Sequence, residues 1–506
     1  MTRTNQIALL LSLLTFAACA WMTQRVYENV PHLEDEIAFV WQARVITQGE
    51  YVIETPYCPS CFLEPFVVDY QGLRFGKYPL GWPAALSLGI RLGVRPLVNP
   101  FLAGLSVWLV YRLASKVLSS RASLLAAFLT ATSPFFLMNS ISLLSHTWSL
   151  FLTLAFTLAW IDCFIYPSRV PRWLTVVTAA VCLGALALTR PLTAVGVALP
   201  FVLHAAWILF KQDWSHKRWL FLFVALTAPI AALELVWQAA VTGSPWLNPY
   251  SLWWPYDRIG FGPGVGLNPG GHNLFYAYVN AKFSLWVGNS DLFGWPYLSG
   301  IFLPLGCIAL YRHKPAWLIT GVLPALVGAY LFYWIGSWLF GPRYYFEGLF
   351  SAAILTAAGI EWLLVKLRKA WPGVRLGRLR FPSPPATITA ALVFLLLLGN
   401  LLFYLPARIG GMNKLYGASR EQLTPFITAQ TQGGITPALV IVHPQQHWME
   451  YGGLLELSDP QLTSPWIFTY SRGSQVDDTL GAFFPGRAVY HYYPDQPDYL
   501  YTVPRT

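Results

Sequence analysis

Charge is scarce in this sequence. Only 11% of its 506 residues are charged, 55% are hydrophobic and the mean hydropathy is +0.48, whereas globular proteins carry roughly 25% charged residues. An ordinary soluble domain is therefore excluded, and a polytopic α-helical membrane protein is predicted.

Cysteine is also rare. The six cysteines are scattered except for Cys58 and Cys61, so no disulfide framework is spelled out. Internal repeats and low-complexity segments are lacking, which excludes a solenoid or propeller.

Long apolar runs, by contrast, are plentiful. A run of about 17 or more residues can cross a hydrocarbon core of about 30 Å. Eleven such runs lie near 7–23, 97–115, 122–140, 143–165, 172–189, 191–210, 218–241, 294–311, 316–336, 346–367 and 386–406.

The placement of basic residues predicts the orientation of these spans. With the N-terminus inside, five short inner loops hold fifteen of the 33 Lys and Arg residues, as the positive-inside rule requires. The segments 24–96, 242–293 and 407–506 are then exterior. We therefore predict a multi-pass protein of the inner or plasma membrane, with its active site and C-terminal region on the extracytoplasmic side.

The sequence pattern changes after residue 406. Short β-like runs, "ALVIVHP", "WIFTYSR" and "AVYHYY", alternate with Pro, Gly and Asp turn signals, and a helix is expected near "VDDTLGAFF". We predict two domains: a membrane catalytic domain over 1–406 and a small soluble exterior α/β domain over 407–506.

Three carboxylates, Glu34, Asp35 and Glu36, follow the first apolar run. The apolar residues after them recur at helical spacing, which predicts an amphipathic helix on the membrane surface that ends near Gly49. Acids in a first turn often cap free N–H groups, and this explanation fits Glu34 and Glu36. Because these two point about 200° apart on a helix, the three acids do not form one cluster. Asp35 is the better placed to act as a base.

Exterior basic residues are unexpected under the positive-inside rule, and five of them lie in predicted exterior turns. They are Arg74, Lys77, Arg190, Arg258 and Arg343. Each alone could extend its charged end to the interface beside aromatic residues. Together they indicate an anion bound at the outer membrane surface, for which Arg and Lys side chains are suited.

The exterior loop 242–293 is rich in Trp, Tyr, Gly and Pro, a composition that suits either carbohydrate rings or lipid headgroups. Asp257 and His272 are its candidate substrate-binding residues, together with Arg258 and with His146 at the exterior end of a span. Cys58 and Cys61 lack the second pair of ligands that a zinc site needs, so we favour a disulfide.

These motifs resemble the polyprenyl-phosphate-dependent GT-C glycosyltransferases, which include protein O-mannosyltransferases and lipid A aminoarabinose transferases. The resemblance rests on the Asp35–Glu36 pair after the first span, on "KYPLGWP" and on "GPRYY". Where the family pattern has two prolines after the lysine, this chain has Tyr78 and Pro79. The resemblance implies a GT-C-like bundle of about 11 transmembrane helices with exterior juxtamembrane helices.

The resemblance also implies residue roles. Asp35 is expected to be the catalytic base, with Glu36 orienting the acceptor, and Lys77 and Arg343 to hold the lipid phosphate. Arg190 and Arg74 are further candidates for the phosphate.

The predicted function is inverting transfer of a sugar from a polyprenyl-phosphate-linked donor to an acceptor glycan, lipid or protein. No nucleic acid partner is expected and no cofactor is required, although a divalent metal is compatible with these residues. One alternative is a transporter or flippase of lipid-linked sugars, for which we expect mid-membrane charges and a two-fold repeat. Another is a structural scaffold, which leaves the exterior bases unexplained.

Overall fold

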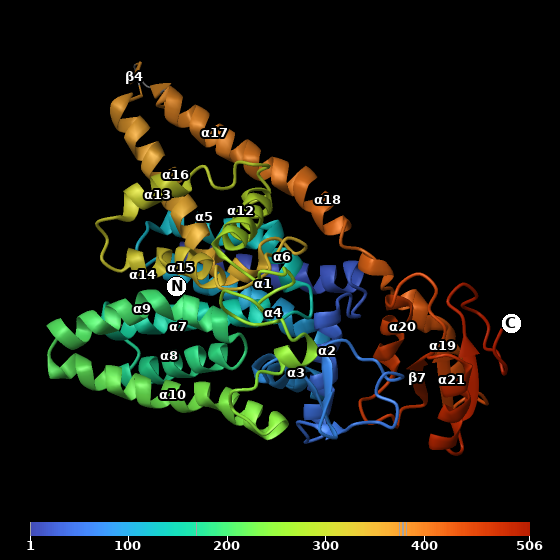
Figure 1. The fold of residues 1–506 in the computed structure, drawn as a ribbon. Coiled ribbons are helices and arrows are strands. Elements are labelled where there is room, and N and C mark those ends of the chain that lie inside the picture. Colours follow the sequence, from blue (N-terminus) through green and yellow to red (C-terminus); the bar gives the residue numbers. More distant parts are fainter. Residues whose placement is uncertain (1, 168, 374, 377–378, 381, 506) are drawn as a thin grey trace.

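The computed structural model describes residues 2–167, 169–373, 375–376, 379–380 and 382–505. Helices form most of the molecule, and a smaller domain that contains strands lies at its C-terminal end (Figure 1). Among the described residues, seven helices are long and apolar enough to cross a membrane. A bent pair adds an eighth if its two helices count as one span. The chain is thus a polytopic helical membrane protein, as its composition predicts.

The helices of this membrane domain follow one another along the chain. Those that qualify as spans are α1 (Arg3–Val26), α4 (Val98–Ala114, with the turn before it), α7 (His146–Phe164), α9 (Pro191–Lys211), α10 (Trp214–Thr242), α16 (Leu349–Ala370, with the 343–348 turn) and α17 (Pro384–Gly399, with its continuation through α18, Leu405–Gly410). The bent pair consists of α5 (Ser120–Ala131) and α6 (Pro134–Ser140), inclined by 56°.

The predicted number of eleven spans is not confirmed, because three apolar runs form shorter or broken helices. They correspond to α8 (Arg172–Ala187), α13 (Leu303–Leu310) and the pair α14 (Ala316–Thr320) and α15 (Val322–Tyr330). Gly294 has a φ of +67° and begins an irregular turn that occupies much of the predicted span 294–311. A hydropathy count registers apolar residues and does not register such a turn.

The segment 242–293 is only partly the loop that the sequence predicts. It contains the short α11 (Tyr250–Trp253) and the 18-residue helix α12 (Leu274–Asp291). The Asn273 side chain caps α12 by accepting the N–H groups of Phe275 and Tyr276 at 3.0 and 3.1 Å. The loop prediction was wrong for this half, because the Gly- and Pro-rich stretch before Asn273 obscured the helix start.

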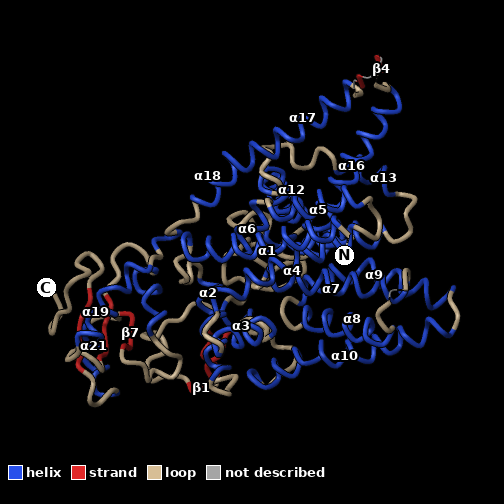
Figure 2. The backbone as a smooth tube through the Cα atoms, turned by 180° about the vertical axis from the view of Figure 1, so that it is seen from behind, coloured by secondary structure: helices blue, strands red, loops and turns tan. Residues whose placement is uncertain are grey.

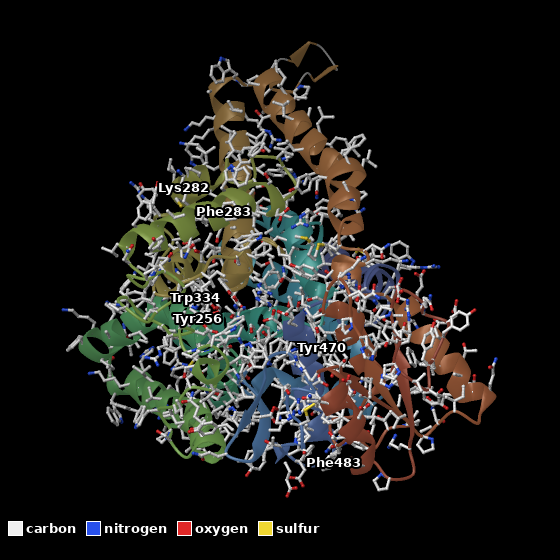
Figure 3. The ribbon with its side chains drawn as sticks, turned by 45° about the vertical axis from the view of Figure 1, so that its right-hand side comes forward. Tyr256, Lys282, Phe283, Trp334, Tyr470 and Phe483 are labelled. Atoms are coloured by element: carbon white, nitrogen blue, oxygen red, sulfur yellow. A yellow bond between two sulfur atoms is a disulfide. The ribbon has the colours of Figure 1, made fainter. Side chains whose placement is uncertain are left out.

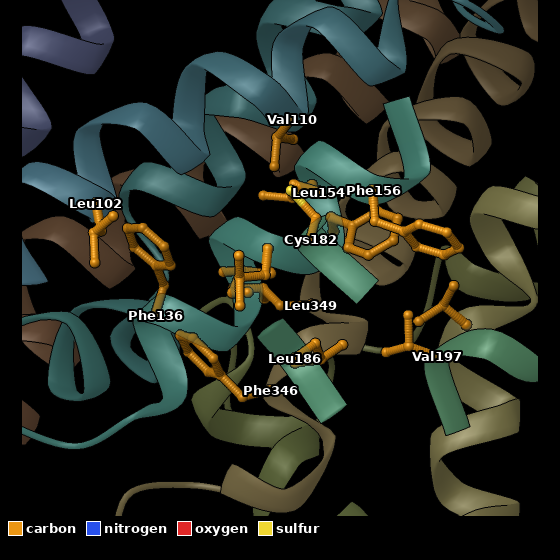
Figure 4. Packing of buried hydrophobic residues seen from close by; sticks show 14 of the residues in the cluster. Leu102, Val110, Phe136, Leu154, Phe156, Cys182, Leu186, Val197, Phe346 and Leu349 are labelled. Atoms are coloured by element: carbon orange, nitrogen blue, oxygen red, sulfur yellow. The ribbon is translucent and has the colours of Figure 1, made fainter. Parts of the chain in front are cut away.

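Large apolar side chains fill the space between the helices (Figure 4). Phe346, in the turn before α16, stacks on Phe136 of α6 with ring centroids 6.2 Å apart. Phe156 of α7 packs on Phe201 of α9 at 4.6 Å. Phe346 also contacts the His146 ring at 6.2 Å. This packing fixes the ends of α7 and α16, which carry two of the predicted site residues, His146 and Arg343.

Helix α2 (Glu34–Thr47) starts at the acidic triplet and ends before Gly49, as predicted. It is not an amphipathic helix with one free face, because every residue from Glu36 to Ala43 is buried. Helix α3 (Gly81–Arg91) packs along it, and the C-terminal domain covers another face, where Ile37 joins the apolar cluster of that domain.

A small antiparallel sheet precedes α3 and has the strand order β1-β3-β2. Its strands are β1 (Ile53–Glu54), β2 (Val67–Tyr70) and β3 (Leu73–Gly76). Val67 pairs with Gly76 at the end of β3. Lys77 follows immediately, and its N–H donates to the Phe66 carbonyl at 2.8 Å. The sheet therefore delivers Lys77 to a fixed position beside α2.

The C-terminal domain has a parallel three-stranded sheet with the order β7-β6-β8. The predicted strands and helix are confirmed: they are β6 (Ala438–Val442), β7 (Trp466–Tyr470), β8 (Ala488–Tyr492) and α21 (Ser474–Leu480). Two further helices, α19 (Thr424–Gln432) and α20 (Met449–Gly452), accompany them. The tube view from behind shows this domain at one end of the molecule, next to α2 and β1 (Figure 2).

The segment 58–61 links the region of the β1-β3-β2 sheet to the C-terminal domain. Cys58 and Cys61 form the disulfide that we favoured, which is drawn in yellow below Tyr470 in Figure 3. The Tyr470 N–H donates to the Cys61 carbonyl at 2.7 Å. On the other side of the interface, Arg44 of α2 donates to the Ser458 carbonyl at 2.8 Å. These contacts hold the domain against α2.

The orientation in the membrane stays a prediction, and a labelling experiment checks it. The predicted inner loop 366–385 includes residues 374, 377–378 and 381, which lie outside the described residues. The exposed Lys314 lies in another predicted inner loop, and the exposed Gln432 lies in the C-terminal domain. In intact cells, a membrane-impermeant maleimide should label Gln432→Cys, and it should label Lys314→Cys only after permeabilisation. The opposite pattern, above the background of the unaltered chain, would reverse the topology.

Candidate active site

A cavity of about 1070 Å³, here called the first cavity, lies between α2, the turn before α3, the ends of several membrane helices and the C-terminal domain. Seven of the ten predicted site residues line it: Asp35, Lys77, His146, Arg190, Asp257, Arg258 and Arg343. Glu36, Arg74 and His272 do not. Most of the charged residues that the sequence analysis singled out therefore line one cavity, although they come from segments up to about 300 residues apart in the chain.

Asp35 lies in the first turn of α2 with its carboxylate at the cavity wall. Its Oδ1 accepts the Tyr78 hydroxyl at 2.5 Å, and its Oδ2 lies 3.5 Å from Nη1 of Arg343. Burial acts to raise the pKa of Asp35, but Arg343, Tyr78 and Lys77 outweigh it and hold this pKa below its usual value. The side chain is 24% exposed. Asp35 is therefore an ionised, accessible carboxylate at neutral pH.

Lys77 projects into a box of aromatic rings. Its Nζ lies 3.8 Å from the Phe66 ring centroid and 4.5 Å from that of Trp254, and it is 3.6 Å from Oδ2 of Asp257. Burial lowers the pKa of Lys77, while Asp257 and Asp35 act to raise it. An ammonium with three donors and one carboxylate partner keeps donors for a further acceptor, such as a phosphate oxygen.

Arg343 begins the short turn that leads into α16. Gly341, two residues earlier, has a φ of +70°, and a Cβ at that position would approach the Phe135 ring to 2.6 Å. Only glycine combines this conformation with this space. The Arg343 N–H then donates to the Gly341 carbonyl at 2.8 Å. The Gly-Pro-Arg-Tyr segment thus aims the guanidinium at Asp35.

Arg190 lies in the turn between α8 and α9, opposite Arg343. It donates to Oε1 of Glu347 at 2.7 Å and to the Tyr330 hydroxyl at 3.1 Å. The turn is held against α3, because the Gly81 N–H donates to the Leu188 carbonyl at 2.9 Å. Arg190 is therefore paired with a fully buried carboxylate, while it also lines the cavity.

His146 is buried and also lines the cavity, at the start of α7. Neither of its ring nitrogens has a hydrogen-bond partner among the described residues. A buried polar atom usually has a partner, so the imidazole is available to donate to a substrate and to accept from it.

The loop 254–272 contributes residues with different roles. Asp257 accepts the Tyr333 hydroxyl and the Trp334 indole N–H at 2.9 and 3.0 Å through Oδ1; Trp334 lies beside Tyr256 in Figure 3. Arg258 is exposed at the cavity edge.

His272 does not reach the cavity. Its Nε2 pairs with the Leu331 carbonyl at 2.9 Å, so the prediction that His272 binds substrate is corrected to a role in holding the loop.

Glu36 also departs from its predicted role, because its carboxylate points away from the cavity. Oε2 accepts the N–H groups of His32 and Leu33 at 2.7 and 3.0 Å, and Oε1 accepts the Leu143 N–H at 2.6 Å. Burial raises the pKa of Glu36 to about 7, and the three N–H donors oppose the rise. Glu36 caps α2 and ties it to the loop before α7, as the helix-start explanation proposed.

Arg74 is the third predicted residue that lies elsewhere. It donates to the Phe62 carbonyl and lies 3.9 Å from Asp69, within the small antiparallel sheet. The prediction that it binds the donor phosphate is therefore corrected. Lys77, three residues further along the extended chain, points to the other side because side chains alternate along a strand.

Several cavity residues were not predicted. Tyr78, Tyr250 and Trp254 surround Asp35 and Lys77, and His447 and Trp448 come from the C-terminal domain. Tyr78 occupies the position where the family pattern has a proline, and that departure was the only available signal for it. No pattern in the sequence relates residues 447–448 to the first span. Among the described residues, no group of three or more His, Cys, Asp or Glu side chains could hold a metal ion.

Comparisons with known proteins identify the fold. No protein-family model and no curated protein sequence matches this chain. Among solved structures, ArnT from Cupriavidus metallidurans bound to undecaprenyl phosphate is similar over 98% of this chain and 91% of its own, with a TM-score of 0.57 and 14% identity. Its apo state gives a TM-score of 0.54 at 14% identity, over 96% and 93% of the two chains.

A second similar structure is the apo oligosaccharyltransferase of Archaeoglobus fulgidus. It has a TM-score of 0.51 and 14% identity over 88% of this chain and 63% of its own. At such identities the likeness is one of fold. The predicted fold, a bundle of membrane helices with a small C-terminal α/β domain, is therefore confirmed by its similarity to ArnT over nearly the whole chain.

The position of Glu36 generates a stability prediction. We expect Glu36→Gln to lower the free energy of unfolding by about 1–3 kcal/mol, because an amide has one oxygen for three N–H donors and its NH₂ group would face another donor. Glu34→Gln, at the first residue of the helix, should change this free energy by less than about 0.5 kcal/mol. Thermal unfolding of the purified variants measures both. A Glu36→Gln protein of unchanged stability but without activity would contradict the capping role and favour contact with substrate.

Proposed function

We propose that this protein is an inverting glycosyltransferase that moves a sugar from a polyprenyl-phosphate-linked donor to an acceptor at the outer face of the membrane. The observation that carries the proposal is the placement of an ionised carboxylate, Asp35, beside Arg343 and Lys77 in one cavity. A similar fold has been solved with undecaprenyl phosphate bound. Similar transferase folds also favour sugar transfer over the flippase alternative.

The chemistry follows from these charges. Asp35 accepts the proton of an acceptor hydroxyl or amine as that group attacks the anomeric carbon of the donor. The bond between the anomeric carbon and the phosphate oxygen breaks, and the phosphate leaves with the bonding electron pair. Attack on the face opposite the leaving group inverts the anomeric configuration, and no covalent sugar–enzyme intermediate is formed.

Lys77 and Arg343 stabilise the departing phosphate. Negative charge grows on the leaving oxygen during bond breaking, and fixed cations in a site of low water content stabilise it strongly. Two cations match the two negative charges that the departing polyprenyl monophosphate acquires, so we propose a polyprenyl monophosphate sugar, carrying a hexose or a pentose, as the donor. Arg190 supplies a third cation, although Glu347 neutralises much of its charge.

The neutral groups of the cavity suit a sugar. His146 has two free ring nitrogens, and the aromatic rings of Tyr250 and Trp254 offer apolar faces with polar edges. His447 and Trp448 bring the C-terminal domain to the same cavity. We propose that His146 contacts the donor and that the C-terminal residues face the acceptor, which we take to be a glycan, lipid or protein.

The Asp35→Asn substitution tests whether Asp35 acts as the general base. Asparagine keeps the size of the side chain and can still accept the Tyr78 hydroxyl, so the protein should fold and bind the donor lipid. Loss of a general base lowers the rate about 10²–10⁴-fold. We expect a loss of at least that size when sugar transfer from polyprenyl phosphate is assayed with purified protein and separated cell-envelope acceptors.

Two control variants make the result specific. Glu34→Gln changes the adjacent cavity carboxylate and should reduce transfer only a few-fold. Lys77→Met fills the aromatic box without a charge, and it should weaken donor binding. Because it also leaves the buried Asp257 carboxylate without its cation, its thermal unfolding midpoint should fall, and donor binding is measured well below that midpoint. Transfer within a few-fold of normal by the Asp35→Asn protein would show that this carboxylate is not the base, and the proposed mechanism would be wrong.

A further inference from the structure

A second cavity, of about 580 Å³, lies on the other side of α2 and shares no lining residue with the first. The segment 50–74 forms one wall and the C-terminal domain, from Tyr451 to Phe468, forms the other. Asp35 faces the first cavity and Trp41, six residues later, lines the second. Six helical residues correspond to about 240° of rotation and about 9 Å along the axis. Helix α2 therefore separates two distinct cavities.

Unpaired polar atoms gather in the residues that line this second cavity. Oε2 of Glu64, the hydroxyl of Tyr451 and the hydroxyl of Ser458 have no hydrogen-bond partner among the described residues. Tyr451 is 0% exposed and Ser458 is 7% exposed. A buried polar group without a hydrogen-bond partner destabilises the fold. Three of them around one cavity indicate that a ligand with several polar groups supplies their partners.

The charges around the cavity narrow the class of ligand. Glu50, Glu54 and Asp459 line it, against the single base Arg74, which is already engaged with the Phe62 carbonyl and Asp69. Such a wall repels phosphates and other anions. A metal ion is not matched either, since the described residues contain no cluster of three metal-ligating side chains.

The remaining wall is aromatic and apolar, formed in part by Trp41, Phe62 and Phe468. We propose that the second cavity binds a saccharide without negative charge, through the Glu64 carboxyl, the Tyr451 and Ser458 hydroxyls and the apolar face around Trp41. The volume lies within the range of about 300–1,000 Å³ that is usual for small-ligand sites. Burial raises the pKa of Glu64 to about 8, so its carboxyl can both donate to sugar hydroxyls and accept from them near neutral pH.

This site does not depend on the proposed transferase function, because no residue of the first cavity takes part. Its position between the region of the β1-β3-β2 sheet and the C-terminal domain suggests that a saccharide would bridge the two. The disulfide-bonded segment 58–61 and Arg44 fix the same junction, so the cavity walls are held in place before a ligand binds.

Saturation-transfer NMR on the purified full chain tests the proposal. The probes are glucose, galactose, mannose, N-acetylglucosamine and glucosamine, with glucuronate as the anionic comparator. We expect at least one of the first five to give a signal, and glucuronate to give a weaker one. The Tyr451→Phe/Ser458→Ala double variant should reduce that signal at least five-fold. Tyr470→Phe, which alters a ring in contact with Tyr451 but outside the cavity, should not.

Two further measurements separate the alternatives. His146→Leu should retain the signal, since the sugar is not bound in the first cavity, where His146 is proposed to contact the donor. Tyr451→Phe should unfold at the same or a higher temperature than the unaltered protein, because it removes an unpaired buried hydroxyl. The proposal is overturned if none of the five sugars gives a signal, if the double variant retains it, or if Tyr451→Phe lowers the unfolding temperature, which would show that the hydroxyl has a partner within the protein.

Discussion

Charge buried beside a membrane must be paired, and this constraint shapes the site. Asp35 faces Arg343, Lys77 faces Asp257, and Arg190 faces Glu347, at distances of 3.5, 3.6 and 2.7 Å. Removing one partner of such a pair leaves an uncompensated charge and typically costs 3–5 kcal/mol. Each pair joins segments far apart in the chain, so the pairs fix the ends of α2, α9 and α16 relative to one another.

Helix α2 is the element that these pairs surround. Its first turn is held by Glu36, whose carboxylate binds three backbone N–H groups, and its last turn is held by Arg44, which binds the C-terminal domain. Asp35 and Glu36, both in the first turn of the helix, thus have different roles. Glu36 accepts hydrogen bonds from backbone N–H groups, whereas Asp35 lies at the cavity wall with cations around it. A carboxylate that is both ionised and reachable is what the proposed proton transfer requires.

Much of this arrangement could be predicted from the sequence, and the failures have physical causes. The sequence indicated that Asp35, Lys77 and Arg343 are site residues, because charged residues beside apolar runs are unusual and require an explanation. Arg74 carried the same signal but lies in a strand whose alternation turns it away from Lys77. The roles of Trp448 and His447 could not be predicted, because the docking of the C-terminal domain on α2 depends on tertiary packing that leaves no local pattern. The break at Gly294 was hidden because hydropathy does not record backbone turns, and helix α12 was missed because a Gly- and Pro-rich stretch precedes its start.

The central claim is that the first cavity holds the phosphate of a polyprenyl lipid between Lys77 and Arg343, next to Asp35. A structure of the protein determined with undecaprenyl phosphate tests this most directly. The account predicts phosphate oxygens within about 3.2 Å of Nζ of Lys77 and of the Arg343 guanidinium, with the lipid chain leading away from the C-terminal domain. A phosphate found instead among the basic loops at the opposite ends of the helices, with Lys77 and Arg343 still bound only to Asp257 and Asp35, would contradict it.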